Sequence, residues 1–116
     1  MMAVTLELMP EFGNKLVKHV DKIKQYADEL ELEEIWLFGS VARGTYSRDS
    51  DIDLMLVTKG DTRRVRRLVD EYGLDDELDE PFVEITVRTR ESLENPAFLF
   101  NTMVKQDRIV LWRRDE

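Results

Sequence analysis

The strongest constraint on the fold of this chain is a regular alternation of helix-like and strand-like segments. Between residues 10 and 32, apolar residues recur at helical spacing, namely Phe12, Leu16, Val20, Ile23, Ala27 and Leu30. Short runs rich in aliphatic and aromatic residues, typical of strands, follow at 34–38, 51–58, 82–89 and 108–112. The intervening segments 39–44, 61–72 and from 95 onward are predicted to form turns and helices. This order predicts an α+β (α/β two-layer) fold, a small mixed β-sheet with packed helices.

Residues that suit helix ends support these boundaries. Pro10 fits the first turn of the first helix. Asp61 or Thr62 can cap the helix that reaches about residue 72. Asn95 followed by Pro96 predicts that the last helix starts there, with the asparagine as its cap.

The composition limits the classes of function. The chain has 116 residues, 25 acidic and 17 basic, with a formal net charge of −8. We expect a single domain over 1–116 and no direct binding of long nucleic acid, whose phosphates need basic surfaces. ATP is still compatible with this charge, because a metal ion can invert the local field. The chain has no cysteine, which excludes disulfides and thiolate metal sites and favours the reducing cytoplasm. No stretch approaches the roughly 20 apolar residues of a membrane span, so we expect no membrane partner.

The turn after the first predicted strand has features of a phosphate-binding site. Gly39 follows the apolar run 34–38 directly, and its lack of a Cβ lets a bulky anion approach the backbone. Backbone N–H groups at the start of the next helical turn favour phosphate, and Ser40 adds a hydroxyl. We interpret this turn as a cradle for the outer phosphates of a nucleotide.

Two carboxylates are separated by one residue in the second predicted strand. Because side chains alternate along a strand, Asp51 and Asp53 project on the same side, while Ile52 and Leu54 take the opposite face. The two acids lie within about 7 Å of each other and repel unless a cation bridges them. Hard oxygen ligands of this kind suit Mg²⁺, which typically binds one or two carboxylates together with substrate phosphates.

Glu84 is the best candidate for a third carboxylate. It lies in the predicted strand 82–89 between Val83 and Ile85, which face the other way. A metal ion or a bound hydroxyl nucleophile would account for an acid at this position. The competing interpretation is a surface acid on an exposed strand face.

The segment 38–57, FGSVARGTYSRDSDIDLMLV, resembles a known signature. In the DNA polymerase β-like nucleotidyltransferases, Gly-Ser is followed after ten residues by Asp-x-Asp, as Gly39-Ser40 and Asp51-Ile52-Asp53 are here. The longer pattern is similar to the minimal nucleotidyltransferases, small proteins often paired with a HEPN-domain protein as antitoxin and toxin. Weaker resemblance extends through FVEI at 82–85 to the last predicted strand.

This resemblance implies the polymerase β-like nucleotidyltransferase fold and a set of roles. The nucleotide would contact Gly39, Ser40, Arg43 and Ser50. One or two Mg²⁺ ions would be held by the catalytic residues Asp51, Asp53 and Glu84. The reaction would transfer AMP from ATP to a hydroxyl, foremost a tyrosine of a HEPN partner, within a homo- or hetero-oligomer. The family more often has Asp at the third position, and the extra methylene of Glu would displace the nucleophile.

Several alternatives remain open from the sequence. The Gly-Ser pair could be a simple turn, and the two aspartates the solvent face of an edge strand. Arg43 could form a structural ion pair, and the basic run Arg63, Arg64, Arg66 and Arg67 could be a solvated helix face or a docking surface. At the level of function, the alternatives are a small-molecule (aminoglycoside-like) nucleotidyltransferase, favoured by net acidity, and a weak or inactive member that neutralises a partner by binding it.

Overall fold

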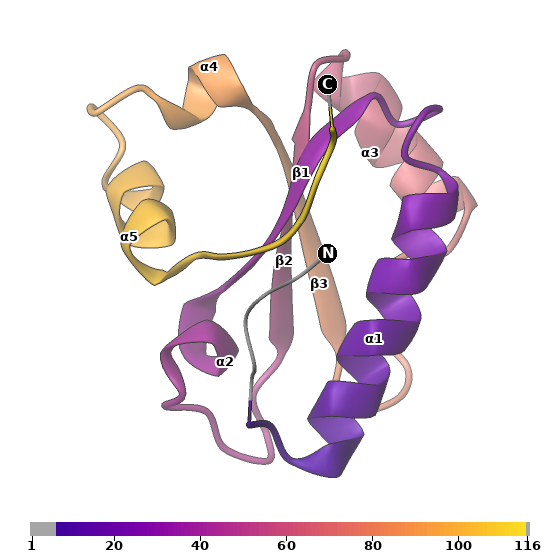
Figure 1. Cartoon of the computed structure of the whole chain (residues 1–116), viewed down its shortest axis with the longest axis vertical. Coiled ribbons are helices and arrows are strands. Elements are labelled where there is room, and N and C mark those ends of the chain that lie inside the picture. Colours follow the sequence, from indigo (N-terminus) through magenta and orange to yellow (C-terminus); the bar gives the residue numbers. More distant parts are fainter. Residues whose placement is uncertain (1–6, 116) are drawn as a thin grey trace.

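A computed structural model describes residues 7–115 and has a mixed four-stranded sheet at its centre (Figure 1). The elements are α1 (Pro10–Gln25), β1 (Leu32–Phe38), α2 (Gly39–Arg43), β2 (Ile52–Thr58), α3 (Thr62–Glu71), β3 (Val83–Thr89), α4 (Arg90–Leu93), α5 (Leu99–Asp107) and β4 (Ile109–Arg113). The strand order is β3-β2-β1-β4, with β2 and β3 parallel and the other pairs antiparallel. The prediction of an α+β fold with a mixed sheet is confirmed.

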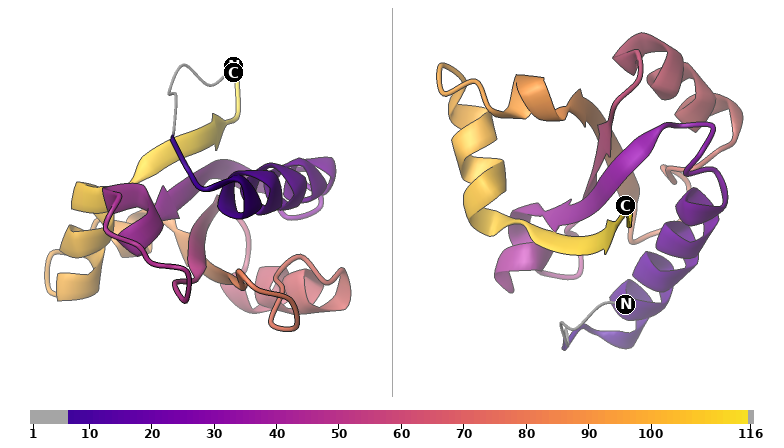
Figure 2. Two further views of the ribbon diagram at one scale, coloured as in Figure 1. Left: turned by 90° about the horizontal axis from the view of Figure 1, so that it is seen from below. Right: turned by 45° about the horizontal axis from the view of Figure 1, so that its top comes forward.

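Helices cover both faces of this sheet. Figure 1 shows α1 and α3 on one side and α4 and α5 on the other, and Figure 2 gives the same division from two further directions. Ile52, Leu54 and Leu56 of β2 are fully buried in the larger core with α1 and α3. Met55 and Val57 of β2 point the other way, into a second cluster that includes residues of α4 and α5. The second strand is therefore anchored from both sides, which fixes the direction of the carboxylates at its start.

The first helix is shorter than the apolar periodicity predicts. It ends at Gln25, and residues 26–31 form turns that lead into β1 at Leu32. Ala27 and Leu30 are buried in the same core as the helix, although they lie outside it. The predicted extension to residue 32 is wrong because a buried turn continued the same apolar spacing.

The predicted start of the last helix is also wrong. The α5 helix begins at Leu99, and the side chain of Asn95 instead accepts a hydrogen bond from the backbone of Ala97. The Asn101 side chain donates to the carbonyls of Ser92 and Asn95 at 2.9 Å each and holds this loop. By contrast, the cap of α3 is confirmed, since the Asp61 carboxylate accepts from the backbone of Arg63.

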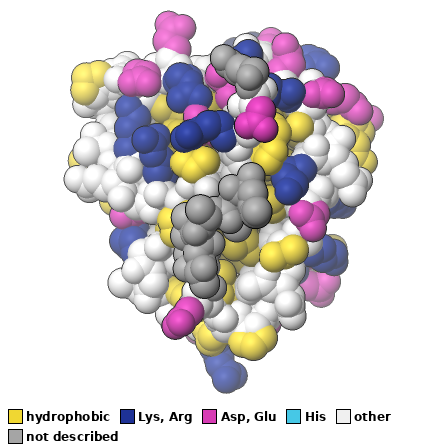
Figure 3. All heavy atoms as spheres, viewed as in Figure 1, with side chains coloured by type: hydrophobic (Ala, Val, Ile, Leu, Met, Phe, Trp, Pro, Cys, Tyr) yellow, Lys and Arg dark blue, Asp and Glu magenta, His cyan; other side chains and the backbone are white. Residues whose placement is uncertain are grey.

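The charged surface is uneven. On the face in Figure 3, Lys and Arg side chains gather in the upper part, with acidic side chains around them. One hollow of about 420 Å³ is lined by Glu33, Glu34, Lys59, Arg90, Arg113 and Arg114.

Within residues 7–115, no helix combines the length and apolar character needed to cross a membrane.

Candidate active site

The predicted site residues come from three neighbouring strands. The C-terminal end of β1 lies against the start of β2, where Phe38 pairs with Asp53. On the other side, Asp53 pairs with Glu84 in the parallel register of β2 and β3. Asp51 precedes β2 by one residue. The sheet thus brings together Gly39, which follows Phe38, and all three candidate carboxylates.

Gly39 allows the close approach of Asp53. Its φ is +75°, a conformation that residues with a side chain rarely adopt. A Cβ at this position would collide with the carboxylate of Asp53, which lies against the glycine. The turn then enters α2, a single helical turn that ends at Gly44 with a φ of 78°. The backbone conformation therefore favours glycine here, and a residue with a Cβ would also displace the carboxylate of Asp53.

Asp53 is electrostatically perturbed by its surroundings. Burial and the neighbouring Glu84 carboxylate raise the pKa of Asp53 to about 6, and Asp51 adds to the effect. Glu84 acts on this pKa both through its charge and through a hydrogen bond between the two carboxyl groups. The positive charge of Arg43 opposes the shift, but its effect is smaller than those of burial, Glu84 and Asp51. Negative charge is therefore concentrated around a partly buried group.

Two of the other residues predicted to contact the nucleotide, Arg43 and Ser50, are engaged in contacts within the protein. Arg43 forms an ion pair with Asp107 of α5 at 2.7 Å, so the alternative of a structural ion pair is present in the fold. The Ser50 hydroxyl accepts a hydrogen bond from the backbone of Ser47 at 2.9 Å and so stabilises the loop before β2. Ser40 is partly exposed in the first turn of α2, next to Gly39.

The donor chemistry of this cluster fits Mg²⁺. The three groups are carboxylates, which are the hard oxygen ligands that this ion prefers. A cation would also relieve the repulsion that raises the pKa of Asp53. Within residues 7–115, however, no three acidic or histidine side chains are arranged around one common metal position. That Asp51, Asp53 and Glu84 hold the ion therefore stays a prediction.

Sequence reasoning missed an aromatic group beside the turn. The ring of Phe100 on α5 lies edge-to-face with Phe38 at a centroid distance of 6.0 Å. The Arg88 guanidinium of β3 lies 5.7 Å from the same ring. A usable signal was the apolar run at 98–100, since Phe98, Leu99 and Phe100 are 58%, 73% and 40% exposed. Three consecutive apolar residues do not fit one helix stripe.

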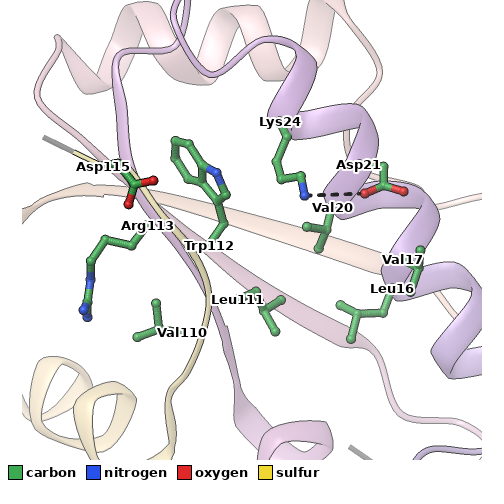
Figure 4. Close-up of a pocket in the computed structure, with 10 residues that line it drawn as sticks. All are labelled: Leu16, Val17, Val20, Asp21, Lys24, Val110, Leu111, Trp112, Arg113 and Asp115. Atoms are coloured by element: carbon green, nitrogen blue, oxygen red, sulfur yellow. Dashed lines mark ion pairs between the residues drawn. The ribbon is translucent and has the colours of Figure 1, made fainter. Parts of the chain in front are cut away.

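A hollow on the α1 side of the sheet lies away from the carboxylates. It occupies about 610 Å³ between α1 and β4, and Figure 4 shows Leu16, Val20, Leu111 and Trp112 among its lining. None of the predicted site residues lines it. Leu16 and Leu111 belong to the core on the α1 side of the sheet, whereas Asp53 projects on the other side together with Met55. This hollow is therefore separate from the candidate active site.

Comparisons with known proteins identify a family for this chain and a solved structure of similar fold. The family model described as "Nucleotidyltransferase domain" matches residues 20–110. A provisionally assigned nucleotidyltransferase from Sulfolobus solfataricus superposes with a TM-score of 0.55 at 21% identity, covering 95% of this chain and 94% of that one. A structure described as a toxin–antitoxin with AMP-PNP has a TM-score of 0.47 at 20% identity, over 81% of this chain and 73% of that one. No curated protein matches. The first structure confirms the predicted fold, and the second is too dissimilar to support an argument.

Proposed function

This chain belongs to the nucleotidyltransferase domain family, and we propose that it is a Mg²⁺-dependent enzyme that transfers AMP from ATP to a hydroxyl acceptor. The observation that carries the proposal is the position of Asp53. Its carboxylate lies against Gly39, pairs in register with Glu84 and has a pKa raised to about 6. A perturbed acid beside a glycine turn is typical of a site built for a charged ligand.

The chemistry assigned to each residue follows from its place. The acceptor oxygen forms a bond to the α-phosphorus, the bond from that phosphorus to the β-phosphate oxygen breaks, and pyrophosphate leaves. Glu84, the most exposed of the three acids, is suited to accept the proton from the hydroxyl. Gly39 and Ser40 would contact the outer phosphates. Bound Mg²⁺, held by Asp51, Asp53 and Glu84, would neutralise the triphosphate and the developing charge.

The acceptor that we propose is a tyrosine of a HEPN-domain partner. The support is the similarity of the whole segment 38–57 to minimal nucleotidyltransferases, which extends well beyond the Gly-Ser and Asp-x-Asp pairs. Modification of the partner would make this protein the antitoxin of the pair. A cysteine-free chain that uses ATP also suits the cytoplasm.

Labelled ATP tests this function. The protein is mixed with ATP carrying label on the α-phosphate, Mg²⁺ and the protein encoded beside it, and label on the partner is followed after electrophoresis. We expect label with the wild type and with Asp49→Asn, a matched control that changes an exposed carboxylate in the preceding loop. We expect none with Asp51→Asn/Asp53→Asn. Label that persists in the double variant would refute the assigned site.

The glutamate at position 84, where the family more often has aspartate, has its own test. Glu84→Gln removes the carboxylate and should abolish transfer, whereas Glu84→Asp keeps it and shortens it by one methylene. If the longer acid is adapted to this acceptor, Glu84→Asp transfers more slowly than the wild type. Nucleotide binding without transfer by any form would instead support a protein that neutralises its partner by binding.

A further inference from the structure

The outer edge of β3, the strand that carries Glu84, is not paired with another strand of the described residues. It is an edge strand, because the sheet order ends at β3. A hollow of about 570 Å³ runs along it, lined by residues of β3 and of the first turns of α3, namely Thr62, Arg63, Arg66, Ile85, Thr86, Val87 and Arg88. Figure 1 shows this strand and helix.

The backbone groups on this edge can be assigned from the contacts at the start of β3. The Phe82 carbonyl accepts a hydrogen bond from Ile52 of β2 at 2.8 Å, so it turns inward. The N–H and carbonyl of Val83 turn outward, where both are bonded to the backbone of Asp76. Since backbone direction alternates along a strand, the groups of Ile85 and Val87 also turn outward. The Asp76 bridge ends at Val83, so the edge is open from Ile85 onward among the described residues.

Arginine side chains bind the carbonyls of this open edge. Arg66 donates to the carbonyl of Ile85 at 2.5 Å, and Arg88 donates to that of Val87 at 2.8 Å. These two carbonyls are thus occupied, while the N–H groups of Ile85 and Val87 turn outward from the sheet. The edge therefore offers hydrogen-bond donors, which an incoming chain would meet with its carbonyl oxygens.

The charge around the edge is basic in an otherwise acidic protein. Arg66 is paired with Asp70 and Asp75 at 2.6 and 2.7 Å. Arg63 and Arg88 form no ion pair within residues 7–115. The chain as a whole carries a formal net charge of −8. Two arginines without an ion pair therefore make the surface beside the outward N–H groups locally positive, which suits an acidic ligand.

We propose that the outer edge of β3 docks an extended, acidic polypeptide segment of the acceptor protein, which adds to the sheet as a further strand. This proposal rests on the proposed function and specifies how the acceptor is presented. Glu84, Thr86 and Arg88 share the face of β3 that is turned away from the buried Val83, Ile85 and Val87. A residue of the added strand opposite Thr86 would lie diagonally from Glu84, at about 7–8 Å, which a tyrosine side chain can span.

The edge favours a polypeptide over nucleic acid for two reasons. The outward N–H groups recur every second residue, about 6.8 Å apart, which is the repeat of carbonyls along an extended peptide. The high net negative charge also opposes the long phosphate backbone of RNA or DNA.

Peptide titration of the ¹⁵N-labelled full chain tests the docking edge without ATP. The probe is a seven-residue peptide with a central tyrosine flanked by alternating glutamate and valine, and its matched control carries lysine in place of glutamate. We expect the acidic peptide to shift the amide signals of Ile85 and Val87 and to slow their hydrogen exchange. Equal shifts with the lysine peptide, shifts only with a single-stranded oligonucleotide, or unshifted Ile85 and Val87 amides would each overturn the proposal.

Charge-reversal variants sharpen the test. Arg63→Glu, on the exposed surface of α3, should weaken binding of the acidic peptide several-fold, and Arg63→Glu/Arg88→Glu by about tenfold. Lys24→Glu is the matched control, since Lys24 is exposed on α1 and lies beside β4, at the opposite end of the sheet from β3. It should change the affinity less than about twofold. An effect of Lys24→Glu as large as that of Arg63→Glu would contradict a site at the edge.

The same variants separate this proposal from the proposed function. Labelling of the partner protein that is insensitive to Arg63→Glu/Arg88→Glu would overturn the docking edge and leave the transferase intact. Peptide binding at Ile85 and Val87 without any labelling would support the edge and count against transfer to protein.

Discussion

Replacing Asp53 by asparagine should make the metal-free protein more stable while it removes transfer activity. Asp53 is partly buried beside Glu84 and Asp51, and these conditions raise its pKa to about 6. Near neutral pH the folded protein therefore carries a negative charge on a partly buried carboxylate that lies beside two other acids. Asparagine keeps the shape of the side chain and removes the charge, so the folded state gains relative to the unfolded one.

The size and sign of this effect follow from proton linkage. The folded-state pKa of about 6 lies above the ordinary value of 3.8, so between these values the folded protein binds more protons than the unfolded one. The stability of the wild type should consequently fall as the pH rises through this window. The difference corresponds to about 3 kcal/mol at most. Because solvent reaches part of the group, we expect a gain of about 1–2 kcal/mol for Asp53→Asn above pH 6.

Urea denaturation in EDTA measures this gain. The free energy of unfolding is compared for the wild type, Asp53→Asn and the control Asp49→Asn near pH 7.5 and near pH 4. We expect the gain of Asp53→Asn at the higher pH and little difference at the lower one, where the aspartate is protonated in the folded state. An Asp53→Asn variant no more stable than the wild type near pH 7.5, or equally stabilised at both pH values, would refute the reasoning.

Three further predictions concern the surroundings of the site. Gly39→Ala should lower the rate of AMP transfer at least about 100-fold and destabilise the folded protein by about 1–2 kcal/mol. The reason is that φ is +75° and that the new Cβ would displace the carboxylate of Asp53. Labelling assays measure the transfer, and thermal unfolding measures the stability. Arg90→Ala should cost about 1–3 kcal/mol, because the buried Glu34 loses a hydrogen-bond partner. Although burial alone would raise the pKa of Glu34, its hydrogen bonds lower it, so the deficit in urea titrations should shrink as the pH falls below the ordinary pKa of 4.5. Leu54→Ala should cost about 2–5 kcal/mol in the same titration, as Leu54 is fully buried.

The order of the elements could be predicted because each strand has a distinctive run of residues. The run 51–58 forms β2 from Ile52 to Thr58, with Ile52 and Leu54 buried on one face, as alternation predicts. The ends of two helices could not be predicted. Ala27 and Leu30 continue the apolar spacing of α1 in a turn, and Asn95 resembles a helix cap while it stabilises a loop. Buried turns and local caps depend on tertiary contacts that the sequence pattern does not contain.

The candidate site could be assembled from the sequence only as far as its carboxylates and glycine turn. The register that pairs Asp53 with Phe38 and with Glu84 depends on how three strands align, and spacing along the chain does not determine it. The ion pair of Arg43 with Asp107 joins residues 64 positions apart and has no local signal. The contact of Phe100 with Phe38 likewise depends on how α5 packs over the sheet.

The two faces of β2 explain how this small fold can hold a repulsive cluster. Ile52, Leu54 and Leu56 are fully buried on one face, and burial of each such side chain contributes about 1.5–3 kcal/mol. Their sum exceeds the roughly 1–2 kcal/mol that we assign to the charge of Asp53. The strand is therefore stable enough to hold its carboxylates close together before any cation binds. The lower stability of a core variant such as Leu56→Ala should therefore be partly restored by adding Asp53→Asn. The double variant should still be inactive, because it lacks the carboxylate of Asp53.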